Sequence, residues 1–190
     1  QMCIRDRFSD ILFPLEALGM DLKYNPGPVF SKFIDHSNFD ELKKVEEAII
    51  DLSFQGDALR ITRDILPKNK SLIGFVGGPW TVTSYGTGMN KGVKYKGNFK
   101  NDFIFKLLTL KIIPLLKKNI ELQISSGAEI VMIFDTDASR IGNSEDFYIY
   151  SNLVYDNLIK PFDCKVGFFA KHPFRLLYTS PSPRDLMRSR

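Results

Sequence analysis

Several residue types that build common sites are scarce in this chain of 190 residues. It has two cysteines, Cys3 and Cys164, and two histidines, His36 and His172. Two cysteines cannot make a framework of several disulfides, and no Cys-x-x-Cys or His-x-Cys spacing is present for a zinc site. Gly-x-Ser-x-Gly and glycine-rich phosphate-loop motifs are also missing. We therefore expect a reducing, cytoplasmic setting and no metal site.

Long uncharged hydrophobic runs are missing as well. The best candidate, residues 103–124, is interrupted by five charged residues, which are Lys106, Lys111, Lys117, Lys118 and Glu121. A membrane span needs roughly 18 uninterrupted apolar residues. No basic and then apolar leader is recognisable at the N-terminus, so secretion is unsupported. We expect no membrane partner.

The formal net charge of +4 would favour nucleic acid if it were gathered on one folded face. Residues 1–7 and 175–190 instead carry the whole excess, because the 26 basic and 22 acidic residues balance once those ends are removed. We expect no nucleic-acid partner. Both ends lack helical and strand periodicity and resemble translated adaptor sequence. We predict non-native tails at 1–7 and 175–190, with ordinary disordered termini as the alternative, and a partial domain at 8–174.

The order of patterned segments predicts an α/β fold. Short apolar runs suited to buried strands alternate with amphipathic stretches, and no two strands are close enough for a hairpin, so we expect a parallel sheet. The expected strands are 8–12, 72–76, 130–134 and 166–170. The expected helices start near Asn38 or Asp40 for about thirteen residues, and then cover 57–66, 99–126 with a kink or a new helix start at Pro114, and a stretch from Asn143 or Ser144 to about 160.

Polar residues follow each expected strand, where parallel α/β folds bind ligands. These residues are Asp10, Tyr85 beyond Gly77–Trp80, Asp135-Thr136-Asp137, and Lys171-His172. Other candidates have simpler interpretations: His36 as a solvated loop residue, Gly86-Thr87-Gly88 as a flexible loop, and Trp80 as either a pocket wall or core packing. The lysines at 91, 94, 96 and 100 are either a solvated surface or an anion-gathering loop.

Three segments together resemble one family. Phe8-Ser9-Asp10-Ile11-Leu12 precedes Glu16-Ala17-Leu18-Gly19-Met20, and Leu72–Thr81 reads LIGFVGGPWT and is followed by Ser84-Tyr85. Gly127-Ala128-Glu129 with Ile133-Phe134-Asp135 is a weaker third match. In order and spacing these segments are similar to uroporphyrinogen decarboxylase across nearly all of residues 8–174. The resemblance implies a partial (β/α)8 TIM barrel, about strands 2–5 of the family fold.

The resemblance also implies a chemistry and its residues. The family removes carbon dioxide from the four acetate side chains of uroporphyrinogen III to give coproporphyrinogen III in haem biosynthesis, with no metal or organic cofactor. It implies that Asp10 is the central carboxylate, that Tyr85 lies beside it, and that Thr136 stands where the family has a serine. Asp137–Arg140 and residues 86–98 depart from the family pattern. The full-length parent would be a homodimer, and the fragment alone inactive.

Two alternatives stay open. One is a cobalamin- or zinc-dependent methyltransferase of the same superfamily, whose ligands would lie outside residues 8–174. The other is a truncated, non-catalytic domain that binds a tetrapyrrole.

For the decarboxylase, a fixed carboxylate could accept hydrogen bonds from the four pyrrole N–H groups, and a positive charge on the ring would be stabilised by it.

Overall fold

The fold is built around a three-stranded parallel sheet. The computed structural model describes residues 10–90, 95, 99–142, 144–163 and 165–170. Its sheet contains β3 (Ile73–Gly77), β4 (Ile130–Asp135) and β5 (Val166–Ala170) in the order β3-β4-β5. In register, Val76 lies opposite Ile133, and Ile133 lies opposite Phe168. The three apolar runs predicted as strands are thus confirmed within one residue, and so is their parallel direction.

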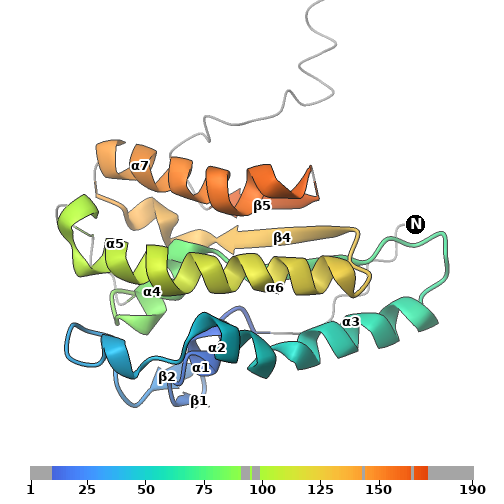
Figure 1. Cartoon of the computed structure of the whole chain (residues 1–190), viewed down its shortest axis with the longest axis horizontal. Helices are drawn as coiled ribbons and strands as arrows, with labels where there is room; N and C mark the ends of the chain where they lie inside the picture. The colour runs from blue at the N-terminus through green and yellow to red at the C-terminus, as the bar shows by residue number, and fades with distance from the viewer. Residues whose placement is uncertain (1–9, 91–94, 96–98, 143, 164, 171–190) are drawn as a thin grey trace, which may run out of the picture.

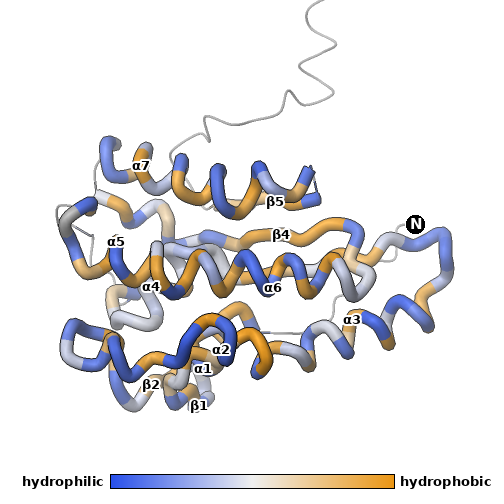
Figure 2. The backbone as a smooth tube through the Cα atoms, viewed as in Figure 1, coloured by the Kyte–Doolittle hydropathy of each residue, from blue (hydrophilic) through white to orange (hydrophobic). Residues whose placement is uncertain are grey.

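The two faces of this sheet differ in how they are covered. Gly74, Val76, Val131 and Ile133 are buried on the face where the helices pack, and Figure 1 shows α6 lying alongside β4. Figure 2 colours β4 as hydrophobic over most of its length, whereas α6 and α7 alternate. On the other face lies a row of phenylalanine rings, Phe75, Phe134 and Phe169, with ring centroids 6.2 and 6.0 Å apart. This second face is only partly covered, because Phe169 is 48% exposed.

A short antiparallel hairpin was not expected. β1 (Leu22–Tyr24) pairs with β2 (Pro28–Phe30), and the Asn25 N–H donates to the Gly27 carbonyl in the turn between them, at 2.9 Å. The expectation that every strand pair is parallel is therefore wrong here. Three-residue strands are too short to show an alternating pattern, and Pro28 cannot donate a ladder hydrogen bond, so the sequence reads as a loop.

The helix expected from Asn38 or Asp40 is divided. Phe39–Glu41 forms one 3-10 turn (η1), the backbone of Leu42 is extended, and α2 covers Val45–Asp51. α3 follows at Ser53–Ile65 and ends before Pro67, as expected, although it starts four residues earlier than predicted.

Pro114 does not break the long helical region. A 3-10 turn at Phe99–Asn101 (η2) leads to α5 (Phe103–Leu107), a π-helical turn at Leu108–Ile112 (η3), and α6 (Ile113–Ser125). Proline lacks the N–H that would bond to the carbonyl four residues earlier, so a widened turn just before it lets the helix continue. Of the two expectations for Pro114, the helix start is confirmed, because α6 begins at Ile113 with Pro114 in its first turn.

The remaining elements are also helical. They are α1 (Phe13–Ala17), α4 (Pro79–Gly86), η4 (Thr136–Arg140), α7 (Ser144–Val154), η5 (Tyr155–Ile159) and η6 (Lys160–Phe162). No helix within the described ranges is long and apolar enough to cross a membrane. The predicted tails at 1–7 and 175–190 lie outside the described residues, so they stay predictions. The observed fold is a partial α/β arrangement of the TIM-barrel kind.

Candidate functional site

The site is built where β3 and β4 end. The Gly78 N–H donates to the Phe134 carbonyl at 2.7 Å, just beyond the last paired residues of the two strands. Gly78 lies so close to Asp135 that a Cβ added to the glycine would overlap the Cβ of Asp135. Glycine is needed at this position for space, since its backbone conformation is one that other residues adopt. The two strand ends are therefore held side by side.

Asp135, the last residue of β4, is the centre of a buried hydrogen-bond network. It is 0% exposed, and its Oδ1 accepts from the Thr81 N–H at 2.8 Å and from the Thr81 hydroxyl at 2.9 Å. Its Oδ2 accepts from the Tyr150 hydroxyl, which in turn accepts from the Trp80 N–H at 2.9 Å. Because α4 has no side-chain N-cap of its own, its first two N–H groups donate to other elements: Trp80 to the Tyr150 hydroxyl and Thr81 to Asp135.

Burial sets the protonation behaviour of this network. Loss of solvent raises the pKa of the Asp135 carboxyl above its ordinary value, although the hydrogen bonds from Tyr150 and Thr81 oppose the rise. Burial, followed by the nearby Asp135 charge, raises the pKa of Tyr150 well above 10. A carboxyl this enclosed is satisfied by the protein itself, which indicates that it supports the edge and does not meet a ligand.

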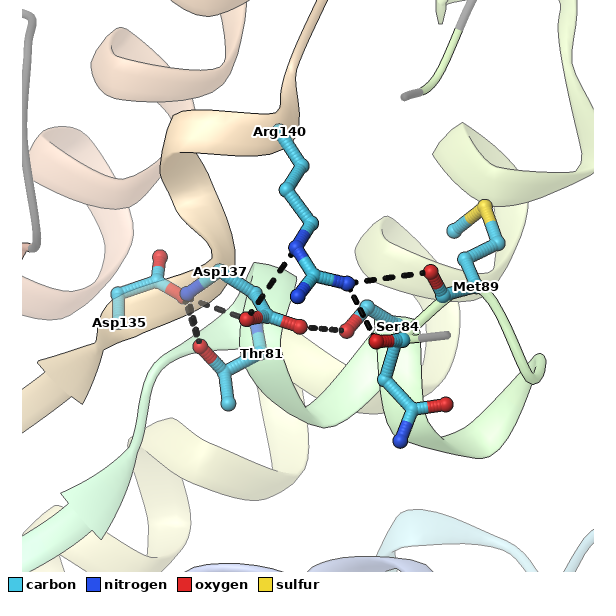
Figure 3. A network of polar contacts seen from close by, with 7 residues as sticks. Thr81, Ser84, Met89, Asp135, Asp137 and Arg140 are labelled. Carbon is cyan, nitrogen blue, oxygen red and sulfur yellow. Dashed lines mark hydrogen bonds and ion pairs between the residues drawn. The ribbon is translucent and has the colours of Figure 1, made fainter. Parts of the chain in front are cut away.

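A second set of contacts joins η4 to α4 (Figure 3). The Ser84 hydroxyl donates to Asp137 Oδ2 at 2.6 Å, and the Asp137 N–H donates to the Thr81 hydroxyl oxygen at 3.0 Å. Arg140 Nε lies 3.7 Å from Asp137 Oδ1, and its Nη1 donates to the carbonyls of Met89 and Asn90. Arg140, which lies in a stretch that departs from the family pattern, is thus engaged with the protein itself.

Asp10 reaches the same edge by a different route. It precedes Ile11, which packs so closely on Gly77 at the end of β3 that a Cβ there would lie 2.6 Å from the Ile11 carbonyl oxygen. The half-buried Asp10 carboxylate accepts from the Leu12 N–H at 2.8 Å and from the hydroxyl of Tyr24, a residue 53% exposed on β1. A carboxylate has about four acceptor positions, so about two are left for other donors.

The first expected strand is not observed as such. Phe8 and Ser9 lie outside the described residues, and Asp10–Leu12 form the turn that enters α1. The bond from the Leu12 N–H to Asp10 Oδ1 makes this turn locally stable, because an aspartate accepting from the N–H two residues later mimics a backbone turn. The expectation of an extended segment is wrong for residues 10–12.

Tyr85 and Thr136 are the other two residues implied by the family resemblance. Tyr85 is half-buried on α4, and the helix end that carries it packs on α1, where a Cβ at Gly86 would lie 2.9 Å from Leu15. Thr136 is half-buried and follows Asp135 directly at the start of η4. In the described part of the chain, no hydrogen bond joins Asp10, Tyr85 and Thr136 to one another. Their roles stay predictions.

Among the other candidate residues that the structure describes, Trp80 is buried in the core, whereas His36 and Lys100 are exposed. Trp80 is 1% exposed and packs with Tyr95, Phe99 and Tyr150, so core packing, and not a pocket wall, is confirmed. His36 is exposed, as expected. Lys100 is exposed too, whereas the lysines at 91, 94 and 96 lie outside the described residues, as do His172 and both cysteines.

Two cavities in the described part of the chain do not contain the predicted residues. One lies between α7 and β5 and is lined by Tyr150 and Phe168 among others, and the second lies between α1 and α2 and includes Phe13 and Lys43. Neither is lined by Asp10, Tyr85 or Thr136, so neither is the cleft expected around them. Across the described ranges, no three His, Cys, Asp or Glu side chains are grouped to hold a metal ion.

Sequence reasoning missed the partners of Asp135. Thr81 and Tyr150 are 54 and 15 residues away along the chain, and no local pattern marks them as partners of one carboxylate. The available signal was an aspartate at the end of an apolar strand, since a buried charge needs donors around it. That signal predicts a network without naming its members.

Comparisons with known proteins agree with this architecture. The family model described as Uroporphyrinogen decarboxylase (URO-D) matches residues 7–172. The chain is similar to the uroporphyrinogen decarboxylases of Campylobacter lari (43% identity over 152 residues; 76% of this chain, 44% of that protein) and Campylobacter concisus (36% over 177 residues; 86% and 51%). It spans about half the length of these curated relatives. A methyltransferase from Methanosarcina mazei has a similar fold, with a TM-score of 0.64 and 16% identity over 89% of this chain and 50% of that one.

Proposed function

We propose a function from one premise, which is that the chain belongs to the uroporphyrinogen decarboxylase family. The proposed activity of the whole protein is cofactor-independent removal of carbon dioxide from the four acetate side chains of uroporphyrinogen III, which yields coproporphyrinogen III for haem biosynthesis. The family match over residues 7–172 is the observation that carries this proposal. Uroporphyrinogen is then the small-molecule partner, and a homodimer is the proposed state of the full-length parent.

The chemistry assigns a task to Asp10. A proton adds to a pyrrole carbon and leaves positive charge on the ring; the bond to the carboxylate then breaks, its electron pair enters the ring, and carbon dioxide leaves. A second proton converts the exocyclic methylene to a methyl group, and the ring carbon releases the first. In the proposal, Asp10 accepts hydrogen bonds from the pyrrole N–H groups and stabilises the positive charge. One such preorganised contact is worth about 3 kcal/mol of barrier.

Two features of the site support this role. Among the described residues, Asp10 keeps acceptor positions that no donor fills, and the next residue, Ile11, packs on the end of β3, where ligands bind in parallel α/β folds. Tyr85 would hydrogen-bond Asp10 or a substrate acetate, and the Thr136 hydroxyl would contact a substrate carboxylate. These two contacts orient the substrate in the proposal and do not take part in bond breaking.

The test requires a complete barrel. In the decarboxylase of Campylobacter lari, the matched half is replaced by residues 10–170 of this chain, and formation of coproporphyrinogen is followed by chromatography. We expect activity in this chimera and a loss of about 10²–10³-fold on Asp10→Ala, since removal of one charge-stabilising group costs that much. Tyr85→Phe should lower the rate by about tenfold, because it removes one orienting contact.

The same assay separates the alternatives. Asp57→Asn is the control for Asp10→Ala, since Asp57 is exposed on α3 and pairs with Arg60. A folded chimera that binds the porphyrinogen without converting it would favour the tetrapyrrole-binding alternative. A chimera that neither binds nor converts it would favour the methyltransferase alternative. The 190-residue chain alone is expected to be inactive, and turnover comparable to the complete enzyme would contradict that expectation.

A further inference from the structure

Thr136 lies in the chain between Asp135 and Asp137, whose carboxylates both accept hydrogen bonds from one face of α4. Asp135 is bonded to Thr81 and Asp137 is bonded to Ser84, and Thr81 and Ser84 are three residues apart, which places them on the same side of the helix. Both contacts are enclosed: Thr81 and Ser84 are 1% exposed, and the side chain of Asp137 is 13% exposed. Figure 3 shows the two carboxylates turned toward α4, Asp135 from the end of β4 and Asp137 from η4.

The same helix carries Tyr85 immediately after Ser84. The contact between Ser84 and Asp137 therefore links the chain neighbours of two residues that the proposed function places at the substrate, Tyr85 and Thr136. We propose that Asp137 is a positioning residue, which acts through Ser84 to fix the separation of Tyr85 and Thr136. This inference rests on the proposed function, and it identifies the contact that sets the distance between Tyr85 and Thr136.

Asp137 is held in place from three directions. Its N–H donates to the Thr81 hydroxyl oxygen, its Oδ2 accepts from Ser84, and its Oδ1 lies 3.7 Å from Arg140 Nε. Arg140 in turn binds the carbonyls of Met89 and Asn90, which follow α4. A carboxylate with this many fixed partners has little freedom to meet substrate, and what it does is join η4, α4 and the segment after α4 into one unit.

The spacing matters because one site must process four acetate groups. After each decarboxylation, the macrocycle has to present the next acetate to the same residues. A displacement of about 1 Å at an orienting group can cost up to 10²-fold in rate without abolishing binding. Loss of the contact should therefore slow each step and leave more product with only some of its acetates converted.

The test compares Ser84→Ala, Asp137→Ala, the double variant and Asp137→Asn in the chimera with the Campylobacter lari enzyme. Either alanine variant should lower kcat by about tenfold with KM within about twofold, and the double variant should be no slower than Asp137→Ala. Asp137→Asn keeps an oxygen that accepts from Ser84, so it should restore most of kcat. Asp57→Asn serves as the control and should leave kcat unchanged.

The product ratio distinguishes positioning from folding. At equal consumption of substrate, the alanine variants should show a larger share of partly decarboxylated products, whereas a loss of folded enzyme lowers the rate without changing that share. An unchanged share, or independent effects of Ser84→Ala and Asp137→Ala, would overturn the inference. A folded but inactive unsubstituted chimera would contradict the proposed function. In that case the contact between Ser84 and Asp137 is tested by stability: additive effects of the two substitutions on the melting temperature of the 190-residue chain would overturn the inference.

Discussion

Asp10 and Asp135 are two carboxylates at one edge of the sheet, and they differ in burial and in the number of hydrogen bonds that they accept from the protein. Asp135 is fully enclosed and receives its hydrogen bonds from Thr81 and Tyr150. Asp10 is half-buried and is bound by one backbone N–H and by the exposed Tyr24. The enclosed carboxylate of Asp135 holds the edge together, whereas the more accessible Asp10 is the one that the proposed function assigns to the substrate.

Replacing each aspartate with alanine gives the largest test of this contrast. In the 190-residue chain, Asp135→Ala should lower the free energy of unfolding by about 3 kcal/mol, because it leaves buried donors on α4 and α7 unpaired. Asp10→Ala should cost less than about 1 kcal/mol, since Asp10 is only half-buried and its partner Tyr24 is exposed. Thermal unfolding followed by circular dichroism measures both. Equal losses for the two variants would remove the contrast.

Two tyrosine substitutions repeat the comparison with a smaller change. Tyr150→Phe removes a hydroxyl that bonds Asp135 and the Trp80 N–H, and it should cost about 2 kcal/mol because both partners stay buried. Tyr24→Phe removes the hydroxyl that bonds Asp10, and it should cost less than about 0.5 kcal/mol because the contact is exposed. Urea unfolding midpoints would show this difference, and a larger effect at Tyr24 would reverse the assignment of roles.

The smallest expected effect is a pH dependence at Asp135. Its folded-state pKa is raised by burial above the ordinary value of 3.8, so the folded chain holds this proton more tightly than the unfolded chain. The stabilisation from the protonated carboxyl is complete below pH 3.8 and is lost as pH rises through the raised pKa. The melting temperature of the wild type relative to Asp135→Asn should therefore fall with rising pH. A difference that increases with pH would mean that the folded state prefers the ionised carboxylate.

The sequence predicts the regular parts of this molecule better than the contacts between them. Continuous apolar runs at 72–76, 130–134 and 166–170 identified the parallel strands, because runs of about five apolar residues are too short for a typical helix and suit strands buried on both faces. The hairpin at β1 and β2 was missed, since three residues carry no measurable period. The helix near Asp40 was predicted too long, because the extended backbone of Leu42 depends on packing that a helical spacing does not reveal.

For the site, the family resemblance supplied Asp10, Tyr85 and Thr136, whereas the residues that hold the edge needed coordinates. Ser84 and Asp137 are 53 residues apart, and although each lies in a segment that the sequence marks as a candidate, no local pattern pairs the two side chains. Asp137 even stands in a stretch that departs from the family. The physical reason is that hydrogen bonds between distant segments depend on how strands and helices align, which no single-sequence period encodes.

The closeness of Gly78 to Asp135 has a consequence for how this protein can change. The gap between two strand ends is set there by a hydrogen atom, the smallest group that a residue can present. One methyl group in its place would have to push the strand termini apart, and every group mounted on them would move with it. The distance between the two strand ends therefore depends on the hydrogen atom that Gly78 carries in place of a side chain, and this atom is not one of the proposed substrate contacts.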